Sequence, residues 1–219
     1  MARLRSVLEW ALILVLLIVI GYFGYTFVFS PPATNTSGLP GGTGGFFQEP
    51  LPAPETFTTT KGTWQFTFTS GYSYTAAGKI VGRHEFPAAM PDGIIPLDLA
   101  VANGDLLIHD NLEFFTFTMG DRTLKYSYDV PNYAGLTEDY IDEHISNNHL
   151  VFLNASLEQE AKQAEVGDCI IVTGKLVDIS GVSGGNTFSG RTSTVRNDEY
   201  PEGCEVILVD TFTPVRCGS

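Results

Sequence analysis

The sequence predicts a mainly β fold with short helices, arranged as a small OB-like Greek-key barrel with extra N-terminal strand material, preceded by one transmembrane helix. Three observations predict it. The chain of 219 residues holds 23 glycines and 12 prolines, which favours strands joined by turns over a helical bundle. Apolar and polar side chains alternate with a period of two along several segments. One clear helix lies just before the second-last predicted strand, which is the order of elements in an OB-like barrel.

The transmembrane helix is predicted at residues 10–29, a run of twenty residues without a charged side chain. A helix of that length spans about 30 Å, the thickness of the hydrocarbon core. Arg3 and Arg5 precede the run, and the positive-inside rule therefore predicts residues 1–9 in the cytoplasm and the rest outside the cell membrane. A cleaved signal peptide is the alternative. It is disfavoured because its apolar region would be shorter and followed by small residues.

The remainder divides by composition into a linker, one folded domain and a tail. Residues 30–55 are rich in glycine, proline, serine and threonine, which is typical of a linker without a core of its own. The predicted extracytoplasmic domain covers residues 56–215, and residues 216–219 form the tail.

The first strands of this domain are predicted from alternation. Trp64, Phe66 and Phe68 fall on one face and threonine and glutamine on the other, as in a half-buried strand. Residues 72–81 form a second candidate strand. Residues 114–128 carry aromatic side chains on both sides of a Gly-Asp pair, which predicts a β-hairpin.

The second half of the domain is predicted to mix helices and strands. Thr137 and Asn154 are expected N-caps. The expected elements are helices at 137–145 and 155–164, strands at 149–153, 169–179 and 204–212, and a loop at 180–193. Gly174, inside one of these strands, is expected to mark a bend or bulge. An immunoglobulin-like sandwich is the alternative fold, and the helix at 155–164 disfavours it.

Composition and motifs restrict the function. The net charge of −13 argues against nucleic acid and against an anionic lipid surface as partners. The sequence contains no G-x-S-x-G, H-E-x-x-H or C-x-x-C motif and no phosphate-binding loop, so we predict no catalytic residue, no metal and no cofactor. The prediction is a membrane-anchored extracytoplasmic binding or scaffold module, non-catalytic, with an unidentified envelope partner.

Two polar groups are the candidate binding residues. One is Asn147, Asn148 and His149, in which the histidine could carry a proton or bind a ligand. The other is Arg196 and Asp198, whose spacing of two places them on one face of an extended segment, with Asp98 and Glu205 as further partners. Both groups could instead be internal polar networks. An envelope hydrolase or metal-dependent enzyme that uses His149, Arg196 and Asp198 is the alternative function.

The C-terminal two-thirds of the chain resembles a family of uncharacterised bacterial membrane-anchored proteins with an extracytoplasmic β-rich domain. The matching residues are Pro96-Leu97-Asp98-Leu99-Ala100, Gly104, Ile145-Ser146-Asn147-Asn148-His149-Leu150, Asn154, Gly167-Asp168, Gly174-Lys175-Leu176-Val177, Arg196, Asp198 and Gly203-Cys204-Glu205. The resemblance implies an anchored extracytoplasmic domain and marks these positions, and it implies no activity. It does not require a cysteine at position 169.

A disulfide is expected between Cys169 and Cys204, because an extracytoplasmic location permits disulfides. Each of these cysteines begins one of the two clearest strands, and Cys217, close to the C-terminus, is the expected unpaired thiol. One consideration opposes this pairing. If the two strands pair antiparallel, the start of one lies near the end of the other, which separates Cys169 from Cys204.

Overall fold

The computed structural model describes residues 35–129, 135–195 and 204–218. The predicted transmembrane segment, residues 10–29, lies outside these ranges, so its position in a membrane stays a prediction. Within the described ranges, no helix is both long enough and apolar enough to cross a membrane. Residues 34–219 form one compact unit, and the description below concerns this unit.

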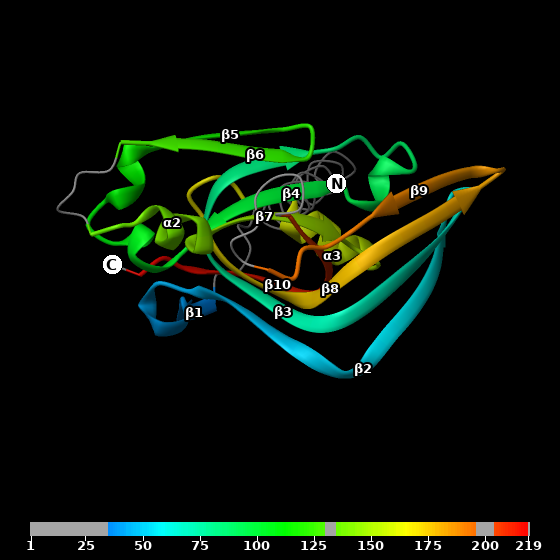
Figure 1. Cartoon of the computed structure of the whole chain (residues 1–219), viewed down its shortest axis with the longest axis horizontal. Coiled ribbons are helices and arrows are strands. Elements are labelled where there is room, and N and C mark those ends of the chain that lie inside the picture. The colour runs from blue at the N-terminus through cyan, green and yellow to red at the C-terminus, as the bar shows by residue number, and fades with distance from the viewer. Residues whose placement is uncertain (1–34, 130–134, 196–203, 219) are drawn as a thin grey trace, which may run out of the picture. The chain divides into compact units, whose positions relative to one another are not determined.

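Strands make up 58% of the residues that the structure describes, and the two α-helices among these residues are short, which confirms the prediction of a mainly β protein. The strands are β1 (Asn35–Gly38), β2 (Gly45–Lys61), β3 (Trp64–Glu85), β4 (Leu97–Ala102), β5 (Phe115–Gly120), β6 (Thr123–Tyr128), β7 (Ile145–Val151), β8 (Cys169–Ser183), β9 (Asn186–Gly190) and β10 (Cys204–Arg216). The α-helices are α2 (Glu138–His144) and α3 (Ala155–Ala161). Short 3-10 helices cover Pro40–Gly42, Asp92–Ile94, Gly104–Leu107 and Asn111–Phe114. Figure 1 shows these elements along the chain.

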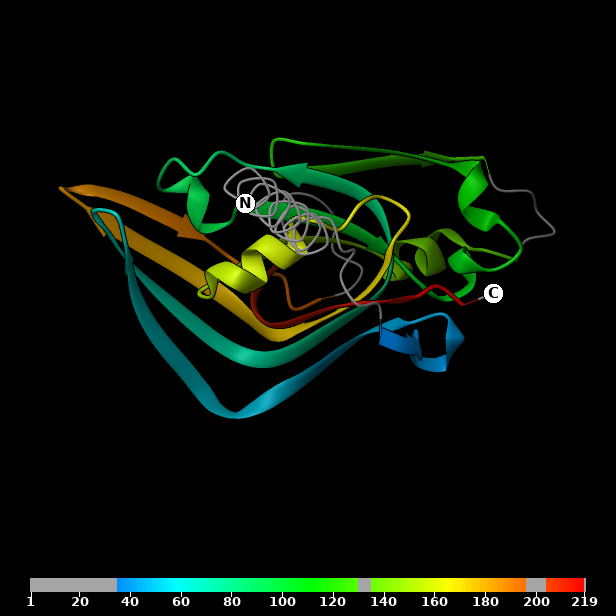
Figure 2. The same ribbon diagram turned by 180° about the vertical axis from the view of Figure 1, so that it is seen from behind.

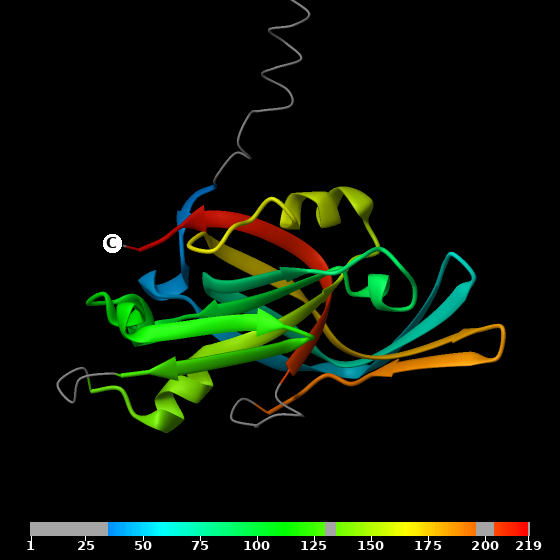
Figure 3. The same cartoon turned by 90° about the horizontal axis from the view of Figure 1, so that it is seen from above.

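Five strands close into a ring of hydrogen-bonded neighbours in the order β3, β4, β7, β10, β8 and back to β3. Every pairing in the ring is antiparallel except β7 with β10, which is parallel. Strand β2 pairs with β3, and β9 pairs with β8. These four strands continue beyond the ring as a sheet-like arm (Figure 3).

The main hydrophobic core lies inside this ring, because each of the five ring strands contributes buried side chains to it. Examples are Tyr74, Leu99, Leu150, Leu176 and Ile207. Helix α3, which connects β7 to β8, packs Ala161 against this core, and Figure 2 shows it running alongside the ring. A separate hairpin, β5–β6, crosses near β4 (Figure 1).

Several local predictions are confirmed. Trp64, Phe66 and Phe68 are buried on one face of β3, and the strand continues without a break to Glu85. The hairpin at 115–128 turns at Asp121 and Arg122, both with positive φ, as its two-residue loop requires. The side chain of Thr137 accepts a hydrogen bond from the Tyr140 amide and so caps α2. Asn154 caps α3 in the same way.

The predicted linker is wrong for the part that the structure describes. Residues 35–55 contain β1 and the first half of β2, and Phe46 packs against the main core. Among the described strands, β2 pairs with β3 alone, and an edge strand tolerates proline because one row of its amides needs no partner strand. The register shifts between Pro50 and Glu55, where its prolines gather. The domain therefore starts well before residue 56.

The predicted loop at 180–193 is also wrong in its first part. Strand β8 extends to Ser183, and β9 returns along it from Asn186. Gly184 and Gly185 form the turn with positive φ values, which glycine adopts without steric penalty. The Gly/Ser composition that indicated a loop therefore belongs to a hairpin.

Gly174 of β8 lies opposite Val209 of β10 and close to the β10 backbone. A Cβ atom at this position would lie 2.2 Å from the backbone carbonyl oxygen of Leu208, and backbone cannot move aside as a flexible side chain can. We expect Gly174→Ala to lower the free energy of unfolding by about 3 kcal/mol, the upper end for overpacking. Denaturant unfolding measures this. Gly190→Ala is the matched control, because a Cβ there meets no atom within 4 Å; similar values for both variants would contradict the argument.

Candidate functional site

Strand β7 carries the polar residues of the candidate site, and it lies between β4 and β10. Its seven residues are all buried. Leu150 packs in the main core inside the ring, so Ser146 and Asn148 point inward with it, because side chains alternate along a strand. Asn147 and His149 consequently lie on the outer face. The prediction placed the asparagines before the strand, whereas they lie within it.

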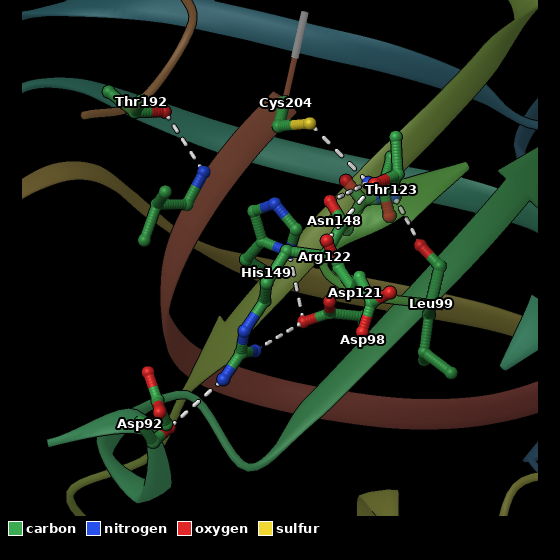
Figure 4. Close-up of polar contacts among 12 residues, drawn as sticks. Asp92, Asp98, Leu99, Asp121, Arg122, Thr123, Asn148, His149, Thr192 and Cys204 are labelled. Carbon is green, nitrogen blue, oxygen red and sulfur yellow. Dashed lines mark hydrogen bonds and ion pairs between the residues drawn. The ribbon is translucent and has the colours of Figure 1, made fainter. Parts of the chain in front are cut away.

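On the outer face, five side chains from four elements come together, and we call them the outer-face cluster. They are Asp98 of β4, Arg122 of the β5–β6 turn, Asn147 and His149 of β7, and Cys204 of β10. Asp98 Oδ1 lies 2.9 Å from Arg122 Nη1 and 2.9 Å from His149 Nδ1. Figure 4 shows the Asp98 carboxylate between the two basic side chains, with Cys204 on the far side of the imidazole ring.

Arg122 was not singled out in the sequence, although it holds the hairpin turn over this face. Its guanidinium carbon lies 3.4 Å from the centre of the Phe86 ring, a cation–π contact. Its Nη2 donates to the backbone oxygen of Asp92 at 3.0 Å. An arginine at a hairpin turn gives no sequence signal for such contacts, because all three partners lie far from it in the chain.

His149 is the titratable centre of the outer-face cluster. Its Nδ1 lies 2.9 Å from Asp98 Oδ1 and forms an ion pair with it when the ring is protonated. Burial alone would lower the pKa of His149. The interactions with the Asp98 carboxylate and the Cys204 thiol outweigh burial and raise the pKa from 6.5 to about 9. His149 is therefore a cation at neutral pH.

Cys204 is half-buried and carries a free thiol. Asn147 Nδ2 donates to Cys204 Sγ at 3.4 Å and to the backbone oxygen of Arg122 at 3.2 Å. Asp98 Oδ2 and Asn147 Oδ1 are buried and have no hydrogen-bond partner within the described ranges. The Asn147 amide and the Asp98 carboxylate of this cluster thus each have one oxygen that accepts no hydrogen bond from the described residues.

The inward-facing residues form a separate network inside the ring. Ser146 Oγ lies 2.9 Å from Asn148 Oδ1 and 3.1 Å from Glu205 Oε2. Asn148 Nδ2 donates to the backbone oxygen of Leu99 at 3.2 Å. The predicted binding residues therefore split: Asp98 and His149 share the outer face, whereas Asn148 and Glu205 face the interior. Arg196 and Asp198 lie outside the described residues.

The predicted Cys169–Cys204 disulfide is wrong. The disulfide joins Cys169 to Cys217, with their Cα atoms 5.2 Å apart. Strands β8 and β10 pair antiparallel, with Cys169 opposite Val215, so the start of β8 lies beside the end of β10 and Cys204 lies at the other end. The residues after 215 are consequently tied to the sheet rather than forming a separate tail.

The pKa of His149 predicts how stability depends on pH. Because its pKa is about 9 in the folded protein and near 6.5 in an unfolded chain, its protonation contributes fully below pH 6.5 and is lost as the pH rises through 9. The shift corresponds to about 3 kcal/mol. We expect the free energy of unfolding to fall by that order between pH 6 and pH 9.5. A His149→Gln variant should lose this dependence, and an equal slope in both proteins would contradict the assignment.

Within the described ranges, no group of three or more histidine, cysteine, aspartate and glutamate side chains is arranged to hold a metal ion. Comparison of the chain with protein-family models, curated proteins and solved structures finds no match. The resemblance described above is therefore carried by the quoted residues alone.

Proposed function

We propose that the chain is a membrane-anchored extracytoplasmic binding module built on an OB-like Greek-key barrel. Along the chain, the first to fifth ring strands are β3, β4, β7, β8 and β10. Around the ring, their spatial order is first, second, third, fifth, fourth and back to the first. The third and fifth strands are parallel, and α3 connects the third to the fourth. This arrangement supports an OB-like barrel, whose second and third strands form the usual binding face.

The observation that carries the proposal is the position of the outer-face cluster. It lies on the outer side of β4 and β7, the second and third ring strands, and includes two charged groups in contact with a buried carboxylate. A partner that docks there meets the partly exposed guanidinium of Arg122 and the half-buried thiol of Cys204, and the buried Asp98 and His149 lie directly beneath them. The net charge of −13 makes nucleic acid an unsuitable ligand for this face, and we assign it to an envelope partner.

The location is proposed from residues 10–29 and supported by the disulfide. A disulfide between Cys169 and Cys217 suits an oxidising compartment outside the cytoplasm. Protease added to intact spheroplasts should degrade the domain and leave the segment before residue 10 protected. Full protection of the domain would show that the orientation is inverted.

Site-specific photo-crosslinking in intact cells tests the binding face. A benzophenone amino acid replaces Thr123, which follows Arg122 in the hairpin, and in a matched variant it replaces Gln159, exposed on α3. We expect a covalent adduct of higher mass from position 123 and none from position 159. No adduct from position 123, or equal adducts from both, would contradict this face as the binding surface.

The alternative is an envelope hydrolase or metal-dependent enzyme that uses His149, Arg196 and Asp198. Of these three residues the structure describes only His149, so this function stays a hypothesis. We prefer the binding module because its proposed face consists of residues that the structure describes. In that face Asp98 contacts both Arg122 and His149.

A further inference from the structure

The arm formed by β2, β3, β8 and β9 carries an exposed face of short hydroxyl side chains. One row crosses the four strands, each residue opposite the next in the strand register, and consists of Thr58, Thr67, Ser180 and Ser189. The neighbouring row contains Thr56, Thr69 and Asp178. Thr67 is half-buried, and the other side chains of the two rows are exposed. Long charged side chains would cover such a sheet face, whereas these short ones leave it open to a ligand.

Two depressions hollow this face, and together we call them the arm groove. Their volumes are about 380 and 440 Å³, and both are lined by Thr69, Asp178 and Arg191, so they adjoin each other. Tyr72 and Leu176 line the second depression. Leu176 also packs in the main core inside the ring, so the groove begins at the mouth of the ring and continues along the arm (Figure 3). It follows β3 from Tyr72 to Thr67, which gives it a length of about 17 Å.

The two charged side chains of the arm groove keep hydrogen-bonding groups for a ligand. Asp178 Oδ1 accepts a hydrogen bond from the Thr192 amide at 3.1 Å, which fixes the carboxylate against the segment that follows β9. Asp178 Oδ2 and the guanidinium of Arg191 form no hydrogen bond or ion pair with the residues that the structure describes. A carboxylate only accepts and a guanidinium only donates. The groove therefore offers both functions at its centre, and its two opposite charges cancel.

This chemistry matches an uncharged, hydroxyl-rich ligand. A sugar hydroxyl donates and accepts hydrogen bonds as the serine and threonine hydroxyls of the arm groove do. Tyr72 and Leu176 supply the apolar surface that small-molecule sites place beside their few polar groups. A polyanion would meet one arginine in a chain of net charge −13, which disfavours it. An apolar helix or lipid would leave the hydroxyls without partners, which costs free energy.

We infer that the arm groove binds a neutral glycan chain. Asp178 and Arg191 form hydrogen bonds with sugar hydroxyls where the two depressions meet, and Tyr72 and Leu176 contact the apolar face of a sugar ring at the mouth of the ring of strands. The inference goes beyond the proposed function, because the arm groove shares no residue with the outer-face cluster. Asp178 follows Leu176 by two residues and so lies on the face continuous with the ring interior, whereas the outer-face cluster lies on the outer side.

Calorimetric titration of the full chain with defined oligomers tests the inference. The protein is held in micelles of a detergent without a sugar headgroup. The titrants are the β-1,4-linked hexamers of glucose and of N-acetylglucosamine, a galacturonic acid hexamer, and a hexapeptide of glycine and serine. We expect saturable binding of at least one neutral hexamer, and the one that binds distinguishes a plain glucan from an N-acetylated chain. Failure of both neutral hexamers to bind, or equally tight binding of the acidic hexamer or the peptide, would overturn the inference.

Matched variants locate the binding in the arm groove. We expect Arg191→Gln to weaken binding of the neutral hexamer about tenfold and Thr69→Ala about threefold, because each loses a hydrogen-bonding group. Arg216→Gln in β10 and Thr118→Ala in β5 are the controls and should bind as the unmodified chain does. All four side chains are exposed, so the substitutions leave the fold intact, and equal melting temperatures verify this. Unchanged binding in both groove variants would show that the glycan binds elsewhere and overturn the assignment.

Discussion

Reduction of the Cys169–Cys217 disulfide is expected to lower the free energy of unfolding by about 4 kcal/mol. The bond closes a loop with a sequence separation of 48 residues, and in the chain-entropy model a loop of that length restricts the unfolded chain by that amount. For a domain of this size the melting temperature should fall by about 10 °C. Thermal unfolding of the full chain with and without reductant, followed by circular dichroism, measures the effect.

The double variant Cys169→Ala/Cys217→Ala separates this effect from any role of Cys204. It should melt at the temperature of the reduced protein, and adding reductant to it should change nothing further. Equal melting temperatures for the oxidised and reduced wild-type chain, with reduction verified by mass spectrometry, would show that the end of β10 holds to β8 without the covalent bond.

Asp98→Asn is expected to destabilise the protein by about 3 kcal/mol at pH 6. The substitution preserves size and removes the charge that both Arg122 and His149 contact at 2.9 Å. Asp98 is fully buried and His149 is 7% exposed, and removing one partner of a buried ion pair leaves the other charge uncompensated. Denaturant unfolding at constant pH gives the difference in free energy.

Asp210→Asn is the matched control, because Asp210 is exposed in β10 and surface substitutions of this kind change stability by less than about 0.5 kcal/mol. The pKa of His149, measured by NMR, should also fall in the Asp98 variant, since the carboxylate that raises it is gone. An unchanged stability together with an unchanged pKa would show that Asp98 does not hold His149 as a cation.

The sequence alone determined the elements whose signals are local. The buried face of β3 follows from a period of two in Trp64, Phe66 and Phe68. Both helix starts follow from a capping side chain, whose hydrogen bonds reach only two or three residues along the chain. The β5–β6 hairpin follows from a Gly-Asp pair between aromatic segments, although the turn itself lies one residue later, at Asp121 and Arg122.

Amino-acid composition gave wrong predictions for two segments whose structure is determined by strand pairing. Glycine and proline between residues 35 and 55 indicated a linker, yet β2 forms there because β3 supplies hydrogen-bond partners along its length. The Gly/Ser stretch after β8 became a hairpin for the same reason. A segment with weak intrinsic secondary-structure preference forms a strand when it can pair with the exposed edge of an existing sheet. The presence of that edge cannot be inferred from the residues of the segment itself.

In the candidate site, too, the residue types could be predicted from the sequence, whereas their contacts could not. Asp98 and His149 were predictable as polar residues next to apolar strands, but their contact follows from the register of β4 with β7, in which they lie opposite each other. The parallel pairing of β7 with β10 brings Cys204 opposite Asn147, and the hairpin turn brings Arg122 to Asp98. The antiparallel pairing of β8 with β10 selects Cys217 as the partner of Cys169. Residue types and local periods are properties of the sequence, whereas these contacts join residues far apart in it, so only the closed ring of strands determines them.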